Sequence, residues 1–495
     1  MDILTLLVVI PVLTMLVLFF ADTLPKARII SAIGMGIELI VSFVLLYKYY
    51  QFRGAGDTSH YLFYKDVVWY STFNIHYTVG IDGIAMAMIM LTSIVIFTGI
   101  FASWNMEYLS KEFFISLILL VSGVYGFFIS LDLFTMFLFY EIAVIPMYLL
   151  IGIWGSGPKE YSAMKLTLML MGASAFLLVG ILGIYYFSGV ETGQYTFNII
   201  ELANHKMPYQ WQMFFFPLTF VGFGVLGALF PFHTWSPDGH ASAPTAVSML
   251  HAGVLMKLGG YGALKVAMYL MPEAAQDQAW IFLILTGISV VYGAFGAIVQ
   301  TDLKYINAYS SVSHCGLVLF AILMMNKTAM NGAVLQMISH GLMTALFFAL
   351  IGMIYGRTHT RLITQMGGLM KVMPFLAVAY VIAGFASLGL PGLSGFVAEM
   401  TIFVGSFQHT DPFHRVLTIA ACASIVITAV YILRVVGKIL FGPVIDEHHL
   451  HLTDATWYEK LTLVTLIVSI AFIGIMPSIA SSLINEGLLS IVAKF

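Results

Sequence analysis

Charged residues are scarce in this sequence. Only 9% of its 495 residues are Asp, Glu, Lys or Arg, whereas 60% are hydrophobic. Soluble domains carry about 25% charged residues, so this composition excludes an ordinary soluble fold. Apolar runs close to the ~20 residues needed to cross a bilayer recur along the whole chain. We therefore expect an all-α, polytopic membrane protein.

Cysteines are scarce as well. The two that are present, Cys315 and Cys422, both lie in apolar runs. This pattern provides neither a disulfide framework nor a cysteine metal site. The histidine-rich stretch "DEHHLHLTD" at 446–454 is the nearest thing to a metal cluster. We interpret it as a solvated connector, because its spacing does not resemble a closed site, and we expect no metal in this chain.

Signals for a redox cofactor are also missing. A literal GxGxxG occurs in "GFGVLG" at 222–227, but it lies inside an apolar span. A dinucleotide site would need a strand before this motif and a helix after it. No other stretch indicates binding of NADH, flavin or an iron–sulfur cluster. Any redox chemistry therefore belongs to other polypeptides.

Hydropathy divides the chain into about fourteen spans. The run from Ile3 to Phe20 lacks a basic leader and a small-residue cleavage site, so we interpret it as the first helix and not as a cleaved signal. The predicted spans are 2–21, 28–48, 82–104, 112–130, 132–153, 163–187, 210–230, 244–270, 279–300, 306–326, 329–355, 374–409, 416–441 and 459–482.

The distribution of basic residues predicts the orientation. An even number of spans places both termini on one side of the membrane. Lys and Arg are more frequent in the loops of the other side, which predicts that this other side is cytoplasmic. In this assignment Lys304 belongs to the cytoplasmic loops and Lys265 to the opposite ones. The two long loops, 49–81 and 188–209, fall on the non-cytoplasmic side.

Several ionisable groups lie at membrane depth. A charge in this position costs at least ~2.5 kcal/mol on insertion scales. One isolated charge can simply pair two helices, but several along one chain favour a path for protons or ions. These groups are Glu38, Glu141, His251, Lys257, His314, His340 and Glu399.

Two spans carry helix breakers beside polar groups. The first is "LFPFHTWSPDGHASAP" and the second is "SLGLPGLSGFVAEM". Broken helices at membrane depth are tolerated where they line a wet cavity, and a matched pair indicates duplicated halves. Their separation fits a repeat of helices four to eight onto helices nine to thirteen.

These stretches carry a family resemblance. "VGIDGIAMAM", "LFTMFLFYEIAVIPMYLLIGIWG", "LFPFHTWSPDGHASAPTAVSMLHAGVLMKLGGYG", "QTDLKYINAYSSVSHCGLV", "ISHGLMTALFF" and "LPGLSGFVAEMTIFVGSF" resemble the M-type, antiporter-like subunits of proton-pumping NADH:quinone oxidoreductase, respiratory complex I. The resemblance implies fourteen helices with two inverted five-helix repeats and broken helices seven and twelve. The implied parts are 1–111 (helices one to three), 112–270 (first repeat), 279–441 (second repeat) and 442–495 (a cytoplasmic loop and helix fourteen).

The resemblance also implies the molecular context. The chain is expected between N-type and L-type subunits and near small membrane subunits, in a bacterial inner membrane with both termini periplasmic. It is expected to translocate protons without a cofactor of its own. NADH, FMN, iron–sulfur clusters and quinone are expected on other subunits.

Seven residues match functional positions of the family. They imply a proton relay whose middle station is the lysine of helix eight. Glu141 matches the glutamate of helix five, Lys165 a lysine near the start of helix six, His233 the histidine of "PFHTW" at the first break, Lys257 the central lysine, His314 and His340 the histidines of helices ten and eleven, and Glu399 the glutamate of helix twelve.

One position departs from the family pattern. Leu226 stands where the family usually carries a helix-seven lysine, the partner of Glu141. We expect Lys165 or water to take over that role, because a lysine side chain can lean inward. Glu38 has no family counterpart, and we expect it to face a neighbouring subunit.

Two alternative functions remain open from the sequence. One is the D-type subunit of a multi-subunit sodium/proton antiporter, which shares this fold and many motifs. The other is a structural spacer that has lost pumping, an alternative that Leu226 supports.

Overall fold

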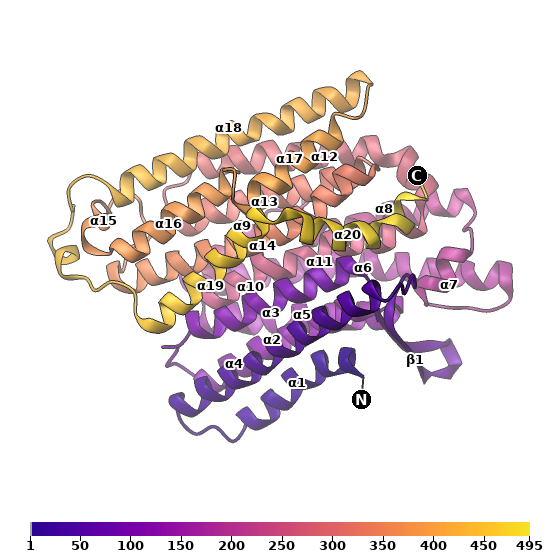
Figure 1. Ribbon diagram of the computed structural model, residues 1–495, viewed down its shortest axis with the longest axis horizontal. Coiled ribbons are helices and arrows are strands. Elements are labelled where there is room, and N and C mark those ends of the chain that lie inside the picture. Colours follow the sequence, from indigo (N-terminus) through magenta and orange to yellow (C-terminus); the bar gives the residue numbers. More distant parts are fainter. Residues whose placement is uncertain (1) are drawn as a thin grey trace.

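The bundle is built from long apolar helices. The computed structural model describes residues 2–495 (Figure 1). Within this range, ten helices are long and apolar enough to cross a membrane. They are α2 (Leu24–Gly54), α3 (Gly83–Ala102), α4 (Ser110–Ile129), α5 (Leu133–Trp154), α6 (Lys159–Thr192), α12 (Pro272–Val299), α13 (Leu303–Leu323), α14 (Lys327–Thr358), α18 (Pro412–Leu440) and α19 (Trp457–Ile475).

Shorter helices complete the set. α1 (Ile3–Leu18) precedes the long helices, and α15 (Leu369–Val372) precedes α16 (Pro374–Ser387). The two breaks lie between α8 (Tyr209–Leu226) and α9 (Trp235–Ser242), and between α16 and α17 (Ser394–Ser406). Each long span and each broken pair matches a predicted span, so the architecture is compatible with fourteen crossings. The prediction of a polytopic helical bundle with two broken helices is confirmed.

Aspartates begin several of these helices. Asp2 accepts a hydrogen bond from the Thr5 N–H, Asp82 accepts one from the Ala85 N–H, and both side chains cap the helices that follow. Asp132 caps α5 in the same way. A carboxylate that satisfies free N–H groups suits these positions. The local sequence therefore sets where these helices begin.

The eighth crossing contains two π-helical segments. It consists of α10 (Thr245–Leu250), η2 (His251–Leu255), α11 (Met256–Gly262) and η3 (Ala263–Met268). Widened turns of this kind are rare in helices generally, and those that occur are often found at functional sites. Here they lie on either side of Lys257.

The second break is made by glycine. Gly389 and Gly392, between α16 and α17, have φ angles of +65° and +93°. Side chains with a Cβ rarely adopt this conformation, so glycine allows the chain to turn inside the bundle.

The two long loops contain secondary structure. The loop 49–81 contains a hairpin, β1 (Leu62–Tyr70) and β2 (Ile75–Ile81), and the loop 188–209 contains α7 (Ile199–Asn204). The last predicted span, 459–482, matches α19 but ends too late, because α19 stops at Ile475 and Pro477 begins α20 (Pro477–Val492). The connector at 446–454 includes a short 3-10 turn, η4 (Glu447–His451).

Both chain termini lie on one side of the bundle. Asp2 pairs with Lys65 of the hairpin at 2.9 Å, and Lys494 donates to the carbonyl of Ala203 at 2.8 Å. The hairpin and the 188–209 loop are themselves joined, because Asn74 donates to the Tyr195 carbonyl. We call this side, with the termini, β1, β2 and α7, the terminal side.

Candidate functional site

Lys257 lies deep in the bundle with defined partners. Its side chain is 1% exposed. The ammonium donates to the carbonyl of Ala252 in the π-helical turn η2 and contacts Nδ1 of His340 at 2.8 Å. A protonated lysine is only a donor, so His340 Nδ1 is then the acceptor. The pair can therefore hold one proton between two nitrogens.

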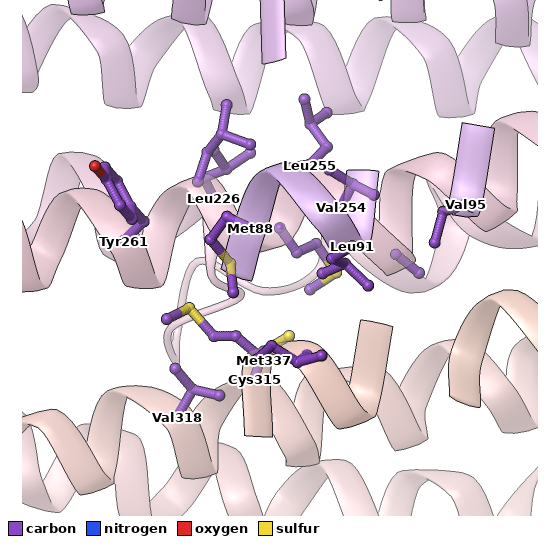
Figure 2. Packing of buried hydrophobic residues seen from close by; sticks show 14 of the residues in the cluster. Met88, Leu91, Val95, Leu226, Val254, Leu255, Tyr261, Cys315, Val318 and Met337 are labelled. Carbon is purple, nitrogen blue, oxygen red and sulfur yellow. The ribbon is translucent and has the colours of Figure 1, made fainter. Parts of the chain in front are cut away.

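The remaining surroundings of Lys257 are apolar. Figure 2 shows part of this shell, in which Cys315, Val318 and Met337 gather near one another. A cavity of about 10 Å³ adjoins the lysine, enough for roughly one water molecule. It is lined by Gly227, Met256, Lys257, Gly260, Cys315, Val318, Leu319 and Met337.

Two histidines continue from Lys257 to a glutamate. The rings of His340 and His314 are 5.2 Å apart, and His314 Nδ1 lies 3.6 Å from Oε1 of Glu399. Gln336 contacts the same His314 nitrogen at 3.0 Å. The structure thus brings Lys257, His340, His314 and Glu399, from α11, α14, α13 and α17, into one buried row. Each gap is short enough for direct transfer or for transfer through one water.

Glu399 ends this row beside the second break. Its side chain is 7% exposed, while Leu390, Pro391 and Gly392 in the break are exposed. A Cβ on Gly389 would lie 2.8 Å from the Glu399 carboxylate. Glycine therefore permits the unwound backbone to approach the carboxylate closely.

Lys165 has a different partner from the one expected. It forms an ion pair with Asp238 of α9 at 2.7 Å, and the Tyr305 hydroxyl donates to the same carboxylate at 3.1 Å. These contacts fasten the second half of the broken helix seven to α6 and α13. The expectation that Lys165 leans towards Glu141 is therefore wrong.

Glu141 stands apart from the buried row. It is only partly buried, it interacts with the Ser174 hydroxyl, and one carboxylate oxygen has no hydrogen-bond partner within residues 2–495. Leu226 is fully buried in the apolar core. No cation among the described residues forms an ion pair with Glu141.

Glu38 is internal, which corrects the prediction that it faces a neighbouring subunit. Its side chain is 0% exposed, and both carboxylate oxygens lack a partner in the described chain. Nearby hydroxyls are bonded to one another, with Ser93 between Ser42 at 2.6 Å and Tyr125 at 2.7 Å. The helices α2, α3 and α4 therefore enclose this carboxyl completely.

The two histidines of the first break lie in different surroundings. His233 is 3% exposed and packs edge-on against Tyr292, with ring centroids 4.9 Å apart. His240, which the sequence did not single out, lies 4.4 Å from His251. Its Nε2 contacts the sulfur of Met256, the residue before Lys257.

Two lysines assigned to loops are buried. Lys304 is 5% exposed and donates to the Ala243 carbonyl at 2.6 Å. Lys265 is 2% exposed and pairs with Asp82. Both lie near predicted span ends, which is why they looked like loop residues. For Lys265 a signal exists, since it follows Lys257 by eight residues and falls on the same helix face.

His409, Asp411 and His414 have ligand atoms within 4.8 Å of one another. Their contacts are those of a helix end. Asp411 caps α18, and hydrogen bonds from the backbone and ring of His414 lower the pKa of Asp411 to about 2. The two imidazoles stack at 4.3 Å and 12°, a nearly parallel arrangement that does not aim both at one ion.

Comparisons with known proteins extend this description. Residues 130–428 match the transmembrane family described as NADH:quinone oxidoreductase/Mrp antiporter. The NAD(P)H-quinone oxidoreductase chain 4-2 of Synechocystis sp. is 37% identical over 83% of this chain and 73% of its own length. The NADH-quinone oxidoreductase subunit M of Rickettsia prowazekii is 32% identical over 100% of this chain and 99% of its own length.

The fold has a counterpart among solved structures. A chain of respiratory complex I from Thermus thermophilus, solved with bound NADH, superposes with a TM-score of 0.89. The match covers 99% of both chains at 22% sequence identity. The whole chain, including both broken helices, therefore follows this architecture.

Proposed function

The chain belongs to the NADH:quinone oxidoreductase/Mrp antiporter transmembrane family, and we propose that it is the proton-translocating M-type subunit of the membrane arm of NADH:quinone oxidoreductase, respiratory complex I. One observation carries the proposal, namely the buried row from Lys257 through His340 and His314 to Glu399. Four protonatable groups in contact range have no structural need to share an apolar interior.

The row suits stepwise proton transfer. A proton on Lys257 can pass to Nδ1 of His340 along the 2.8 Å contact, which leaves a neutral amine. His340 can pass a proton on to His314, and His314 to the Glu399 carboxylate. We assign Glu399 the role of exchange group with the outer aqueous side, because exposed backbone of the break adjoins it.

Three other residues that match the family, His233, Lys165 and Glu141, act where protons enter this row. His233, with the Lys165 and Asp238 ion pair, stands at the first helix break. Glu141 is partly exposed on α5 and acts at the edge of the subunit, so its charge is coupled to a neighbour more directly than to Lys257. The domains follow the repeats, 112–270 and 279–441, which are flanked by 1–111 and 442–495.

The redox chemistry takes place elsewhere in the complex. Subunits that hold NADH, FMN, iron–sulfur clusters and quinone supply the free energy, and this chain binds no cofactor. It lies between N-type and L-type subunits and beside small membrane subunits. The complex lies in a bacterial inner membrane, with the terminal side of this chain towards the periplasm.

The sodium/proton antiporter alternative is less well supported. The family includes Mrp antiporter chains, but the relatives compared above are named NAD(P)H-quinone oxidoreductase chain 4-2 and NADH-quinone oxidoreductase subunit M. The structural-spacer alternative rested on Leu226, yet the row from Lys257 to Glu399 does not pass through that position.

Replacing Lys257 tests the proposal. Lys257→Ala removes the middle station and an unfavourable buried charge, so we expect the complex to assemble and to lose the proton transport of this subunit. NADH-driven proton uptake by proteoliposomes and a native gel measure the two properties. Wild-type proton uptake per NADH in the assembled variant would rule out the relay. Lys206→Met, an exposed lysine outside the row, is the control.

A further inference from the structure

The Asp82 and Lys265 ion pair is a second charged site near the terminal side. Their side chains are 1% and 3% exposed. Asp82 caps α3, and Lys265 lies in the π-helical segment η3. A buried ion pair often contributes less stability than well-packed apolar residues of the same volume. Stability alone does not explain two opposite charges at this place.

The helix register connects this pair to Lys257. Lys257, Tyr261 and Lys265 are spaced by four residues and lie on one face of the same crossing. At the helical rise, the two lysines are about 12 Å apart along the axis, with the tyrosine between them. The Tyr261 hydroxyl interacts electrostatically with Lys265, Asp82 and Tyr61.

A surface pocket approaches the pair from the terminal side. It measures about 410 Å³ and is lined by Ser59, His60, Tyr61, Tyr64, Asn198, Ile200 and Glu201. The ammonium of Lys265 lies 5.2 Å from the ring centroid of Tyr61. The Tyr61 hydroxyl is buried and has no hydrogen-bond partner in the described part of the chain. Tyr61 therefore lies both in the wall of the pocket and beside the ion pair.

His60 is suited to accept a proton at this boundary. It lies in the loop before β1, and its Nε2 contacts the Ser490 hydroxyl of α20 at 2.9 Å. Burial and the nearby charge of Lys265 hold the pKa of His60 below its ordinary value. The imidazole is thus neutral near pH 7 and has a free acceptor nitrogen in one of its tautomers.

Other titratable groups also surround the pair. Tyr49 of α2 interacts electrostatically with Asp82, and Tyr269 interacts with Lys265. Glycine brings α20 close, because a Cβ on Gly487 would lie 3.0 Å from the Asp82 carboxylate. The C-terminal helix therefore packs directly against the Asp82 carboxylate.

We propose that Asp82 and Lys265 form a second outlet gate, beside the row that ends at Glu399, between Lys257 and the pocket at His60 and Tyr61. This inference rests on the proposed proton-translocating function. In the closed state the two charges compensate each other. An N–H bond of the Lys257 ammonium breaks, an O–H bond forms on Asp82 by way of Tyr261, and the neutral Asp82 carboxyl releases Lys265. Asp82 then passes the proton through the Tyr61 hydroxyl to His60 and pocket water, and its carboxylate pairs with Lys265 again.

The test compares variants of the assembled complex in proteoliposomes. Asp82→Asn with Lys265→Met removes both charges, and Asn still caps α3. Because the gate receives its proton from Lys257 while the row to Glu399 stays intact, we expect this double variant to lose part of the proton uptake per NADH that Lys257→Ala loses. Combining all three changes should cause no further loss. Lys206→Met with Glu273→Gln neutralises an exposed pair on the same side and should pump normally.

The Tyr61→Phe variant distinguishes a role of the Tyr61 hydroxyl in proton transfer from a purely structural role. It removes only a hydroxyl without a partner, so a purely structural site would keep its melting temperature and its pumping. We expect the melting temperature to stay and proton uptake to fall, with quinone reduction by the uncoupled complex unchanged. Normal pumping in Tyr61→Phe, or in the double variant, would overturn the gate while Lys257→Ala still pumps less. Normal pumping in Lys257→Ala would instead overturn the proposed function.

Discussion

The energetic role of a buried ionisable side chain in this protein depends on its hydrogen-bond partners. Lys257 has two partners inside the bundle, whereas Glu38 has none within the described chain. An unpaired buried carboxyl is neutral or costly, because no hydrogen bond repays its dehydration. Two residues that look alike in the sequence, each an ionisable group in an apolar run, therefore have opposite energetic roles.

Replacing Glu38 with an apolar residue should stabilise the protein. We expect Glu38→Leu to raise the free energy of unfolding by about 1 kcal/mol and to leave assembly intact, since it removes an unsatisfied carboxyl. Thermal unfolding of the purified complex and a native gel measure the two effects. Glu141→Leu, at a partly exposed position, is the comparison. Failure of Glu38→Leu to bind neighbouring subunits would mean that the carboxyl reaches a partner after all.

Lys165 should be coupled to Asp238 and not to Glu141. A double-mutant cycle of Lys165→Ala and Asp238→Ala should show a coupling of about 0.5–1 kcal/mol, which is typical of a partly exposed ion pair. The cycle of Lys165→Ala with Glu141→Ala should be additive. Thermal unfolding of the wild type, the three single variants and the two double variants measures both cycles. Coupling only in the second cycle would contradict the contact seen here.

At the scale of elements, small residues allow the helices to approach one another. A Cβ on Gly259 of α11 would lie 2.6 Å from the backbone of Gly227 and of Phe223. In a membrane bundle, close backbone packing replaces the hydrophobic effect as the force between helices. The same contact holds the lysine crossing against the first half of the broken helix seven. The position of Lys257 therefore depends on glycine as well as on its own hydrogen bonds.

Gly259→Ala should disturb both stability and transport. Overpacking of this kind typically costs about 1–3 kcal/mol, and here it must push α8 and α11 apart. We expect a lower melting temperature and weaker NADH-driven proton uptake. Gly172→Ala is the matched control, because nothing lies within 4 Å of its added Cβ. Equal melting temperatures for the two variants would show that the crossing tolerates a methyl group.

At the scale of the whole molecule, the terminal side gathers features that are far apart in sequence. The hairpin β1 and β2, the helix α7 and both chain ends meet there through the contacts of Asp2 and Lys494. Figure 1 shows the hairpin projecting from the bundle on this side. Its exposed aromatic residues, Trp69, Tyr70 and Phe73, leave it free to contact other subunits.

Labelling should show that the terminal side faces away from the cytoplasm. Thr72→Cys in the hairpin and His448→Cys in the 446–454 connector are both exposed positions. A membrane-impermeant maleimide applied to intact spheroplasts should react with Thr72→Cys and not with His448→Cys. Labelling should reverse in inverted vesicles. The opposite pattern would reverse the orientation derived from the basic residues.

The sequence by itself determined that the chain lies in a membrane, where its spans fall and which residues form the buried row from Lys257 to Glu399. Hydropathy depends on local composition, so the membrane bundle and its two breaks follow from the apolar runs and from proline and glycine. The family motifs pointed to Lys257, His314, His340 and Glu399, and the structure brings these residues together.

Only the tertiary structure decided which charges meet. Lys165 contacts Asp238, Lys265 contacts Asp82 and Glu38 turns inward, although their positions along the chain indicate none of this. The partner of a buried charge lies on a helix that is distant in sequence, and the helix faces that meet are set by packing across the bundle. Hydropathy reports the depth of a residue in the membrane, whereas its partner depends on the rotation and contacts of every neighbouring helix.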